Sequence, residues 1–159
     1  MNEDARFEDG GGKPLRLMAV DAADLEVISS LTQDAVFPAT EMAWHPKARE
    51  FALLLNRFRW EDAQDASKRG RPVERVQSVL LFGDVEKVQS QGVSKRDKDV
   101  VMSLLAIAWE PGEDGTGRLT LTLAGDGAIA LDVETINARL QDVTRPYVAP
   151  SKKVPGHPE

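Results

Sequence analysis

The chain has 159 residues, of which 42% are hydrophobic and 29% charged, and its 20 basic and 26 acidic side chains give a net charge of −6. These values are typical of one soluble globular domain, and the acidic balance works against broad contact with nucleic acid or anionic lipid. There are no cysteines and only two histidines, which excludes disulfides, thiolate catalysis and cysteine-ligated metal sites and leaves little imidazole chemistry.

Both ends of the chain are predicted to be disordered tails. Residues 1–13 are polar and contain three consecutive glycines, and residues 149–159 contain three prolines. A single globular domain is therefore expected at residues 14–148. The acidic, glycine-rich start does not resemble a signal peptide, and no apolar run approaches the ~20 residues of a membrane helix. We therefore expect a cytoplasmic protein that does not contact a membrane.

The first predicted elements are a strand and a helix. The segment "LRLMAV" (15–20) is a short apolar run typical of a strand. Asp21 and Asp24 then occupy positions that match the N-cap and N3 residues of a helix, where carboxylates favour the positive end of the helix dipole. A helix of about three turns is expected from this point. Its apolar stripe consists of Leu25, Ile28 and Leu31, with Val27 beside them.

The middle of the chain predicts a hairpin followed by a loop. The segment "HPKAR" (45–49) supplies a turn between two extended segments. The second segment begins "FALLL" and is apolar on both faces, so it is expected to be a central strand that becomes half-exposed towards its end. Residues 61–74 are charged and contain Gly70 and Pro72, which favours a mobile surface loop.

Strand character then returns. Gly83 and Asp84 are expected to divide residues 75–93 into two strands. The segment "VVMSLLAIAW" (100–109) is apolar on both faces and fits a buried helix or a central strand by periodicity alone. The polar segment before it, and the Pro-Gly pair after it, favour the strand.

The last predicted elements are a hairpin and a helix. In residues 118–134 leucines alternate with threonines, a Gly-Asp-Gly turn follows, and apolar residues alternate again, which is typical of a hairpin. The glycines of this turn lead into a strand and not onto a helix, so a phosphate-binding loop is not expected. Residues 134–143 predict a terminal amphipathic helix. Its stripe consists of Ile136, Leu140 and Val143.

These elements predict the α+β class. We expect a mostly antiparallel β sandwich or partly open barrel of about seven strands, with an N-terminal and a C-terminal helix. This order of elements resembles a pleckstrin-homology-like fold, and another α+β sandwich or roll is the alternative. Such folds carry many unrelated functions, so the architecture does not indicate an activity.

The segment "RFRW" (57–60) is the sharpest local pattern. Strand alternation is expected to place Phe58 and Trp60 on one side, in the core, and Arg57 and Arg59 on the other side, in water. A nucleic-acid platform instead needs exposed aromatic rings flanked by cations on the same surface. Six basic and four acidic residues between positions 56 and 77 leave a local charge of only +2. Nucleic acid is therefore not the expected partner.

No catalytic, cofactor-binding or metal-binding residue is predicted. A lone histidine such as His45, in a turn, is most often a solvated side chain. The leading hypothesis is a non-enzymatic binding or accessory domain that contacts a protein or peptide. The alternative is a small-molecule-binding protein or enzyme with a carboxylate-lined cleft between sheet and helix, for which Glu110 and Asp132 are candidates. Oligomerisation through an uncovered edge strand stays open. The candidate partner surface consists of Trp44, Arg57, Arg59, Trp60, Arg69, Arg71 and Arg75.

Several separated blocks of the sequence together suggest a family. They include "LRLMAVDAADLEVISSLTQDAV", "FALLLNRFRWE", "MSLLAIAWE" and "LTLAGDGAIALDVE" followed by "NARLQD". In this order they resemble an alphaproteobacterial domain-of-unknown-function family, DUF2948, over residues 15–143. The resemblance implies a bacterial cytoplasm and brings no activity, cofactor or catalytic residue with it.

Overall fold

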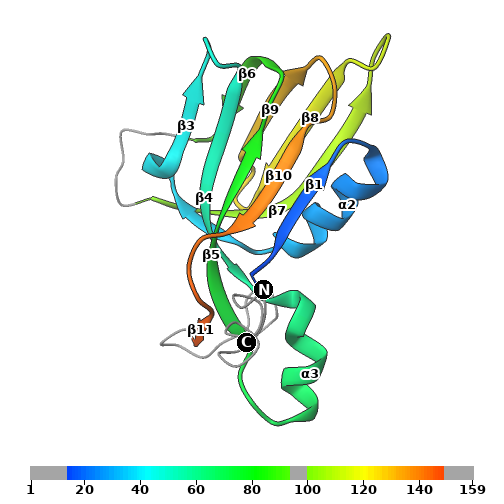
Figure 1. Ribbon diagram of the computed structural model, residues 1–159. Coiled ribbons are helices and arrows are strands. Elements are labelled where there is room, and N and C mark those ends of the chain that lie inside the picture. Colours follow the sequence, from blue (N-terminus) through cyan, green and yellow to red (C-terminus); the bar gives the residue numbers. More distant parts are fainter. Residues whose placement is uncertain (1–13, 94–99, 149–159) are drawn as a thin grey trace.

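The computed structural model describes residues 14–93 and 100–148 (Figure 1). The predicted tails at 1–13 and 149–159 lie outside these described residues. The described part contains eleven strands, two α-helices and two 3-10 helices, η1 and η2. In chain order they are β1 (Arg16–Ala19), α2 (Ala22–Leu31), β2 (Val36–Pro38), η1 (Ala39–Glu41), β3 (Met42–His45), β4 (Glu50–Phe58), η2 (Trp60–Asp62), α3 (Ala63–Lys68), β5 (Glu74–Phe82), β6 (Val85–Gln91), β7 (Val101–Pro111), β8 (Gly117–Leu123), β9 (Ala128–Val133), β10 (Ala138–Asp142) and β11 (Tyr147–Val148).

The strands form one open antiparallel sheet. Their order along the sheet is β1-β10-β5-β4-β2-β7-β8-β9-β6, with β3 paired to β4 and β11 paired to β5. The short strand β2 pairs with both β4 and β7 and connects two halves of the sheet. One half is β1-β10-β5-β4, and the other is β7-β8-β9-β6. The sheet does not close on itself, because β1 and β6 are its two end strands.

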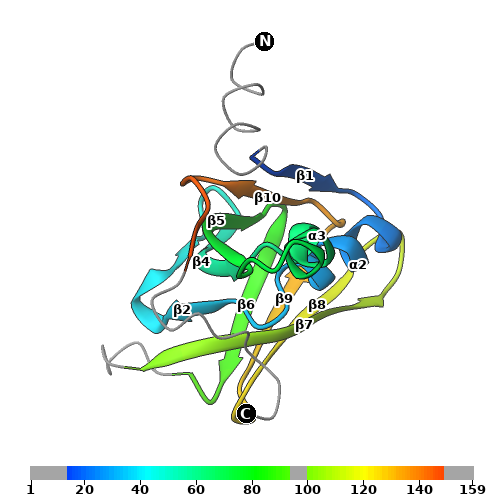
Figure 2. The same ribbon diagram turned by 90° about the horizontal axis from the view of Figure 1, so that it is seen from below.

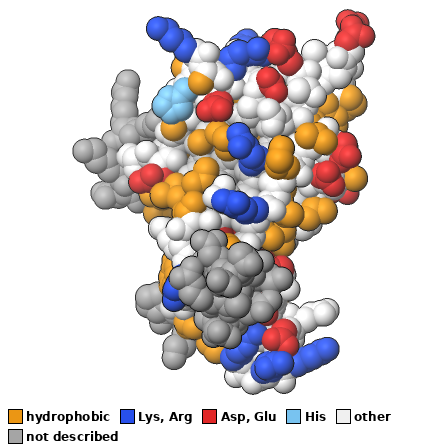
Figure 3. Space-filling view, in the orientation of Figure 1, with side chains coloured by type: hydrophobic (Ala, Val, Ile, Leu, Met, Phe, Trp, Pro, Cys, Tyr) orange, Lys and Arg blue, Asp and Glu red, His pale blue; other side chains and the backbone are white. Residues whose placement is uncertain are grey.

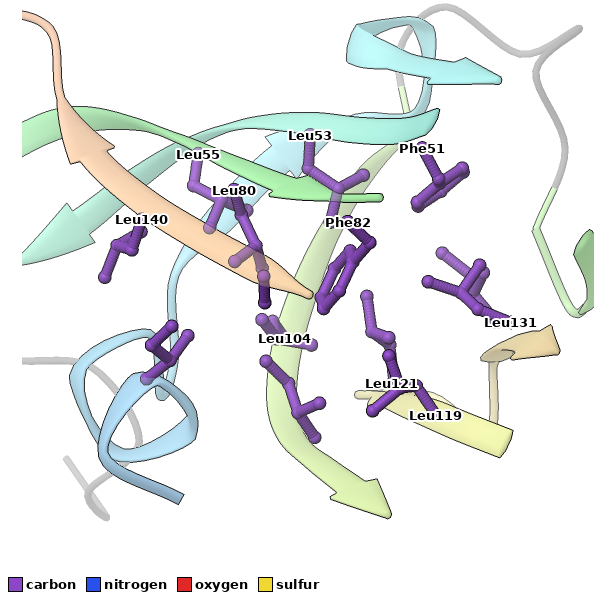
Figure 4. Packing of buried hydrophobic residues seen from close by; sticks show 14 of the residues in the cluster. Phe51, Leu53, Leu55, Leu80, Phe82, Leu104, Leu119, Leu121, Leu131 and Leu140 are labelled. Atoms are coloured by element: carbon purple, nitrogen blue, oxygen red, sulfur yellow. The ribbon is translucent and has the colours of Figure 1, made fainter. Parts of the chain in front are cut away.

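The two halves face each other across a single hydrophobic core (Figure 4). Strand alternation turns every second side chain inward, and these inward positions are mostly leucine, valine, isoleucine or phenylalanine in both halves. Leu53, Leu80 and Leu140 come from the first half, and they are at most 1% exposed. Leu104 and Leu121 oppose them from the second half and are fully buried. Burial of these side chains is the main force that holds the two halves together.

Helix α2 fills the space between β1 and β7, and we call this region the β1–β7 seam (Figure 2). The Asp21 carboxylate caps the helix by accepting a hydrogen bond from the Asp24 backbone N–H at 2.8 Å. Leu25 and Ile28 point into the core and are 2% and 1% exposed. On the β7 side, the Ile107 backbone N–H donates a hydrogen bond to Ser29 Oγ at 2.9 Å. The helix predicted from the sequence is therefore confirmed.

Most of the predicted strands are also confirmed. The first strand, the hairpin with its turn at 46–49 and the division at Gly83-Asp84 occur as expected. Residues 101–109 of the segment predicted at 100–109 belong to the long strand β7, and β8 and β9 form the final hairpin. The sheet has eleven strands and not about seven, and the pleckstrin-homology-like arrangement is not confirmed.

The prediction of a C-terminal helix at 134–143 is wrong. Residues 138–142 form β10, which lies between β1 and β5 and pairs with both strands. Ala138 and Leu140 point inward, whereas Arg139 and Gln141 are exposed. The apolar spacing of so short a segment fits either a helix or a strand. Residues 138–142 form a strand because β1 and β5 flank them and supply backbone hydrogen bonds on both sides.

The prediction of an irregular loop at 61–74 is wrong in its first half. The helices η2 and α3 occupy residues 60–68. Ala66 is fully buried and anchors α3. Gly70 has a φ of 68°, and the N–H groups of Gly70 and Arg71 bond back to Ser67 and Ala66, which closes the helix with a Schellman motif. The charged side chains of this segment form ion pairs, among them Arg69–Asp65, Arg71–Asp62 and Arg71–Asp65.

Candidate functional site

Arg57 is the largest fully buried side chain among the described residues, at 0% exposed. It is the last inward-facing residue of β4, at the end of the core nearest to η2. Its Nε donates to Ser78 Oγ at 3.0 Å, and its Nη2 donates to Asp142 Oδ1 at 2.9 Å. Nη2 also donates to Glu61 Oε2 at 3.0 Å, and Nη1 donates to Glu61 Oε1 at 2.9 Å and to the Phe58 carbonyl at 3.1 Å. All five guanidinium N–H groups therefore have acceptors.

The charges around Arg57 explain why it can be buried. Burial by itself would lower its pKa, but the hydrogen bond and charge of Glu61 and the charge of Asp142 outweigh that effect and raise the pKa. Burial would likewise raise the pKa of Glu61, and the Arg57 guanidinium lowers it instead. The cluster joins β4, β5, β10 and η2. Asp142 Oδ2 also accepts the Leu15 backbone N–H at 2.8 Å, which fixes the start of β1.

A second arginine cluster lies beside the first. Arg59 is 5% exposed, and its Nη1 contacts Glu74 Oε1 at 2.5 Å and Asp62 Oδ2 at 3.3 Å. Arg71 bridges Asp62 and Asp65 at 2.8 Å each. Hydrogen bonds from Arg71 hold the pKa of Asp65 below its usual value. These pairs connect α3 to the end of β4.

The expectation that Arg57 and Arg59 point into water is wrong. Alternation along β4 places Arg57 on the same face as the buried leucines, which a count from the start of the strand would have shown. The strand ends at Phe58, so alternation no longer applies to Arg59 and Trp60. Phe58 is buried as expected, at 1% exposed. Trp60 packs 5.7 Å from it between ring centroids.

The seven residues of the predicted partner surface do not form one exposed patch. Arg57 and Arg59 are internal, and Trp60 Nε1 donates to the Gln33 carbonyl at 2.9 Å. Arg75 lies over the Phe58 ring at 4.3 Å, and Arg69 pairs with Asp65 at 3.1 Å. Together with Arg71, these side chains tie η2 and α3 to the sheet.

Trp44 lies at the opposite end of β4 from this cluster. It pairs in register with Phe51, seven residues before Phe58. At a rise of roughly 3.3 Å per residue, this places it about 23 Å away along the strand. Its surroundings differ as well, because it lines an apolar pocket and not an arginine cluster.

This pocket lies where β3, which is paired to β4 off the main path of the sheet, approaches the end strand β6, and we call the region the β3–β6 seam. Among the described strands β3 pairs with β4 alone and β6 pairs with β9 alone, so the second edge of β6 faces no other described strand. The backbone of the two regions meets at one point, where the Val85 N–H donates to the Arg49 carbonyl at 2.9 Å. Beyond it the strands separate, leaving a pocket of about 140 Å³. Its lining consists of Met42, Trp44, Phe51, Val88, Ser90, Val93 and Ile129.

The sequence contained only weak signals of this pocket. Each lining residue looks like an ordinary inward-facing position of a strand, and nothing local indicates that β3 and β6 stay apart. Of the lining residues, only Trp44 was a candidate on sequence grounds. For the arginine cluster, Asp142 and Ser78 were missed because they lie far from Arg57 in sequence. A carboxylate within an apolar segment was the one available signal for Asp142.

The predicted carboxylate pair does not converge. Glu110 and Asp132 lie on β7 and β9, on either side of Arg118 in β8, so two strand spacings of about 10 Å in total separate their backbones. Arg118 Nε donates to Asp132 Oδ1 at 2.8 Å and lowers the pKa of that carboxyl. In the part of the chain that the structure describes, no cluster of three or more carboxylates and histidines could hold a metal ion. His45, in the β3–β4 turn region, is exposed.

Comparison with known proteins gives a family and no activity. The family model "Protein of unknown function (DUF2948)" matches residues 15–157, which confirms the resemblance seen in the sequence. No curated protein and no solved structure matches the chain significantly. Neither helix within residues 14–93 and 100–148 has the length and apolar character needed to cross a membrane. The match covers nearly all of the sheet, both seams and the arginine clusters, and the chain therefore belongs to the DUF2948 family.

Proposed function

We propose that this protein is a non-enzymatic binding domain that captures an extended segment of a protein partner at the β3–β6 seam. The observation that carries the proposal is an apolar pocket bordered by the edge of β6, which among the described strands pairs only with β9. Strand edges bind extended peptides through main-chain hydrogen bonds, and pockets beside them select the side chains. The β3–β6 seam offers both features at one place.

The lining of the pocket defines the chemistry of the occupant. Met42, Trp44 and Phe51 form one wall, and Val88 and Ile129 form the other. Ser90 is the only polar side chain among the lining residues. A charged group would lose its hydration there without gaining a partner, whereas an apolar side chain would be buried favourably. The volume of about 140 Å³ suits one branched aliphatic or aromatic side chain.

The edge of β6 supports the same proposal. Its first half carries Glu86 and Lys87 and a bulge after Val85, features that discourage strand pairing. Its second half, from Val88 to Gln91, is uncharged and lacks proline. This uncharged half borders the pocket. A peptide strand can therefore pair with β6 at the place where one of its side chains would enter the pocket.

The proposal can be tested with acetylated pentapeptides of the form Thr-Thr-X-Thr-Thr. Trp44 serves as the reporter, because its ring lines the pocket, and a Trp44→Phe variant identifies its share of the fluorescence. With leucine at X we expect a saturable change in Trp44 emission. With alanine at X the affinity should fall about tenfold, because less apolar surface is buried. With aspartate no binding is expected.

A pair of variants shows whether the seam itself binds the peptide. Ser90→Phe fills the pocket from β6 and should abolish the change in emission. Gln89→Phe is the matched control, because residue 89 points to the opposite face of the same strand, and it should bind like the wild type. Equal binding of the leucine and aspartate peptides, or unaltered binding by the Ser90→Phe variant, would refute the proposal.

A small apolar molecule is a second candidate occupant of the same pocket. The supporting observation is the volume, since a cavity of about 150 Å³ lined by apolar side chains accepts a benzene-sized ligand. Toluene would then change Trp44 emission in the wild type but not in Ser90→Phe, while none of the pentapeptides would bind. This candidate takes the place of the carboxylate-lined cleft expected from the sequence, because no carboxylate is among the lining residues.

A further inference from the structure

The outer face of the first half-sheet carries two neighbouring rows of side chains, which we call the outer-face patch. Strand register defines the rows. The first runs across the strands from Met18 through Arg139 and Leu81 to Ala52. The second row runs from Arg16 through Gln141 and Val79 to Leu54. Apart from two arginines and one glutamine, both rows are apolar, and neither contains a carboxylate.

Arg16 and Arg139 differ from the other arginines in the described residues. Most of those pair with carboxylates, and Arg75 lies over an aromatic ring. For Arg16 and Arg139, no carboxylate, hydrogen-bond acceptor or ring lies within contact distance in the part of the chain that the structure describes. They lie on adjacent strands, one diagonal position apart, because Arg16 is opposite Gln141. Two free cations are thus concentrated at one place on a chain of net charge −6.

On the face shown in Figure 3, exposed apolar side chains lie around basic ones. Met18 is 62% exposed, Val20, next to it on the same face, is also 62% exposed, and Val143 is 49% exposed. Shallow grooves of about 410 and 190 Å³ flank the strand that carries Arg139. Large apolar side chains that gather on one face of a soluble domain commonly mark an interaction surface.

We infer that the outer-face patch binds an acidic segment of another protein, in which carboxylates are interspersed with apolar side chains. Carboxylates complement Arg16 and Arg139, and the apolar side chains complement Met18, Leu81 and Val143. A polynucleotide backbone would match the arginines but leave the apolar surface uncovered, and two cations are few for a phosphate-binding surface. The patch is on the outside of β1, β10 and β5, whereas the β3–β6 seam lies at the other edge, so the inference does not depend on the proposed function.

A random dodecapeptide library displayed on phage supplies the probe, because selection from such a library does not require the sequence of the partner. The full-length wild-type chain is the target, and the Arg16→Gln/Arg139→Gln double variant is used to deplete the library of other binders. Both side chains are exposed and unpaired, so the double variant should unfold at the same temperature as the wild type. We expect the retained peptides to be enriched in aspartate and glutamate next to apolar residues.

One retained peptide is then synthesised and its affinity is measured by fluorescence anisotropy. The double variant should bind about tenfold more weakly, and higher salt should weaken binding to the wild type. Arg69→Gln, which removes one exposed positive charge at the C-terminal end of α3, and Ser90→Phe, at the β3–β6 seam, should bind like the wild type. Retained peptides without acidic enrichment, no retained peptides, or equal affinity in the double variant would overturn the inference. A dimer of the chain itself that dissociates in the double variant would overturn it as well.

Discussion

The two seams of this sheet differ in what fills them. At the β1–β7 seam, α2 inserts Leu25 and Ile28 into the core, and these side chains are almost completely buried. At the β3–β6 seam no element of the described residues is inserted, and a pocket lined by half-buried Trp44 and Val88 is left. The same sheet therefore has one seam that a helix fills and one that keeps a pocket. A sheet that curls without closing must either cover its remaining gap or leave it accessible.

The largest expected effect compares the two seams directly. Ile28→Ala should lower the free energy of unfolding by about 3–4 kcal/mol, because it leaves a cavity in the filled seam. Val88→Ala, at the pocket, should cost less than about 1 kcal/mol, because Val88 already borders open space. Urea denaturation followed by circular dichroism measures both values. Similar losses in the two variants would show that the β3–β6 seam is packed as tightly as the other.

Asp142 tests whether the buried arginine cluster holds β1 in place beside α2. Asp142→Asn removes one of the two carboxylates that pair with Arg57 and weakens the contact to the Leu15 N–H. We expect a loss of about 2–3 kcal/mol, somewhat below that of a fully broken buried pair because Glu61 remains. Asp132→Asn is the matched control, since it disrupts an exposed pair with Arg118 and should cost less than about 1 kcal/mol. Equal losses in the two variants would show that the buried pair of Asp142 with Arg57 stabilises the fold no more than the exposed pair of Asp132 with Arg118 does.

The smallest effect concerns the cap of α2. Asp21→Ala removes the hydrogen bond to the Asp24 N–H and should cost about 1 kcal/mol. Asp24→Ala removes a first-turn carboxylate but leaves the cap intact, and should cost about half as much or less. Thermal unfolding resolves the difference if both are measured at the same pH. A larger loss in Asp24→Ala would assign the stabilisation to the helix dipole and not to the cap.

Local patterns predicted most of the fold for a physical reason. The cap at Asp21, the Gly-Asp-Gly turn and the leucine–threonine alternation of β8 each act over a few residues, so no distant partner was needed to interpret them. Residues 138–142 were misjudged because their short apolar spacing fits both a helix and a strand. The Arg57 cluster was missed because its carboxylate partners are 4 and 85 residues away and one of them belongs to that misjudged segment.

The sequence by itself determined the β-rich class, the capped helix and the membership of the DUF2948 family, because period, turn chemistry and shared blocks are properties of the linear chain. Only the tertiary structure decided that β10 joins the sheet and that Arg57 lies in the core. It also decided that α2 fills the β1–β7 seam whereas the β3–β6 seam keeps a pocket. Each of these depends on strands that are distant in sequence and adjacent in space. Side-chain burial and free backbone edges are set by that adjacency, and the candidate binding surfaces follow from it.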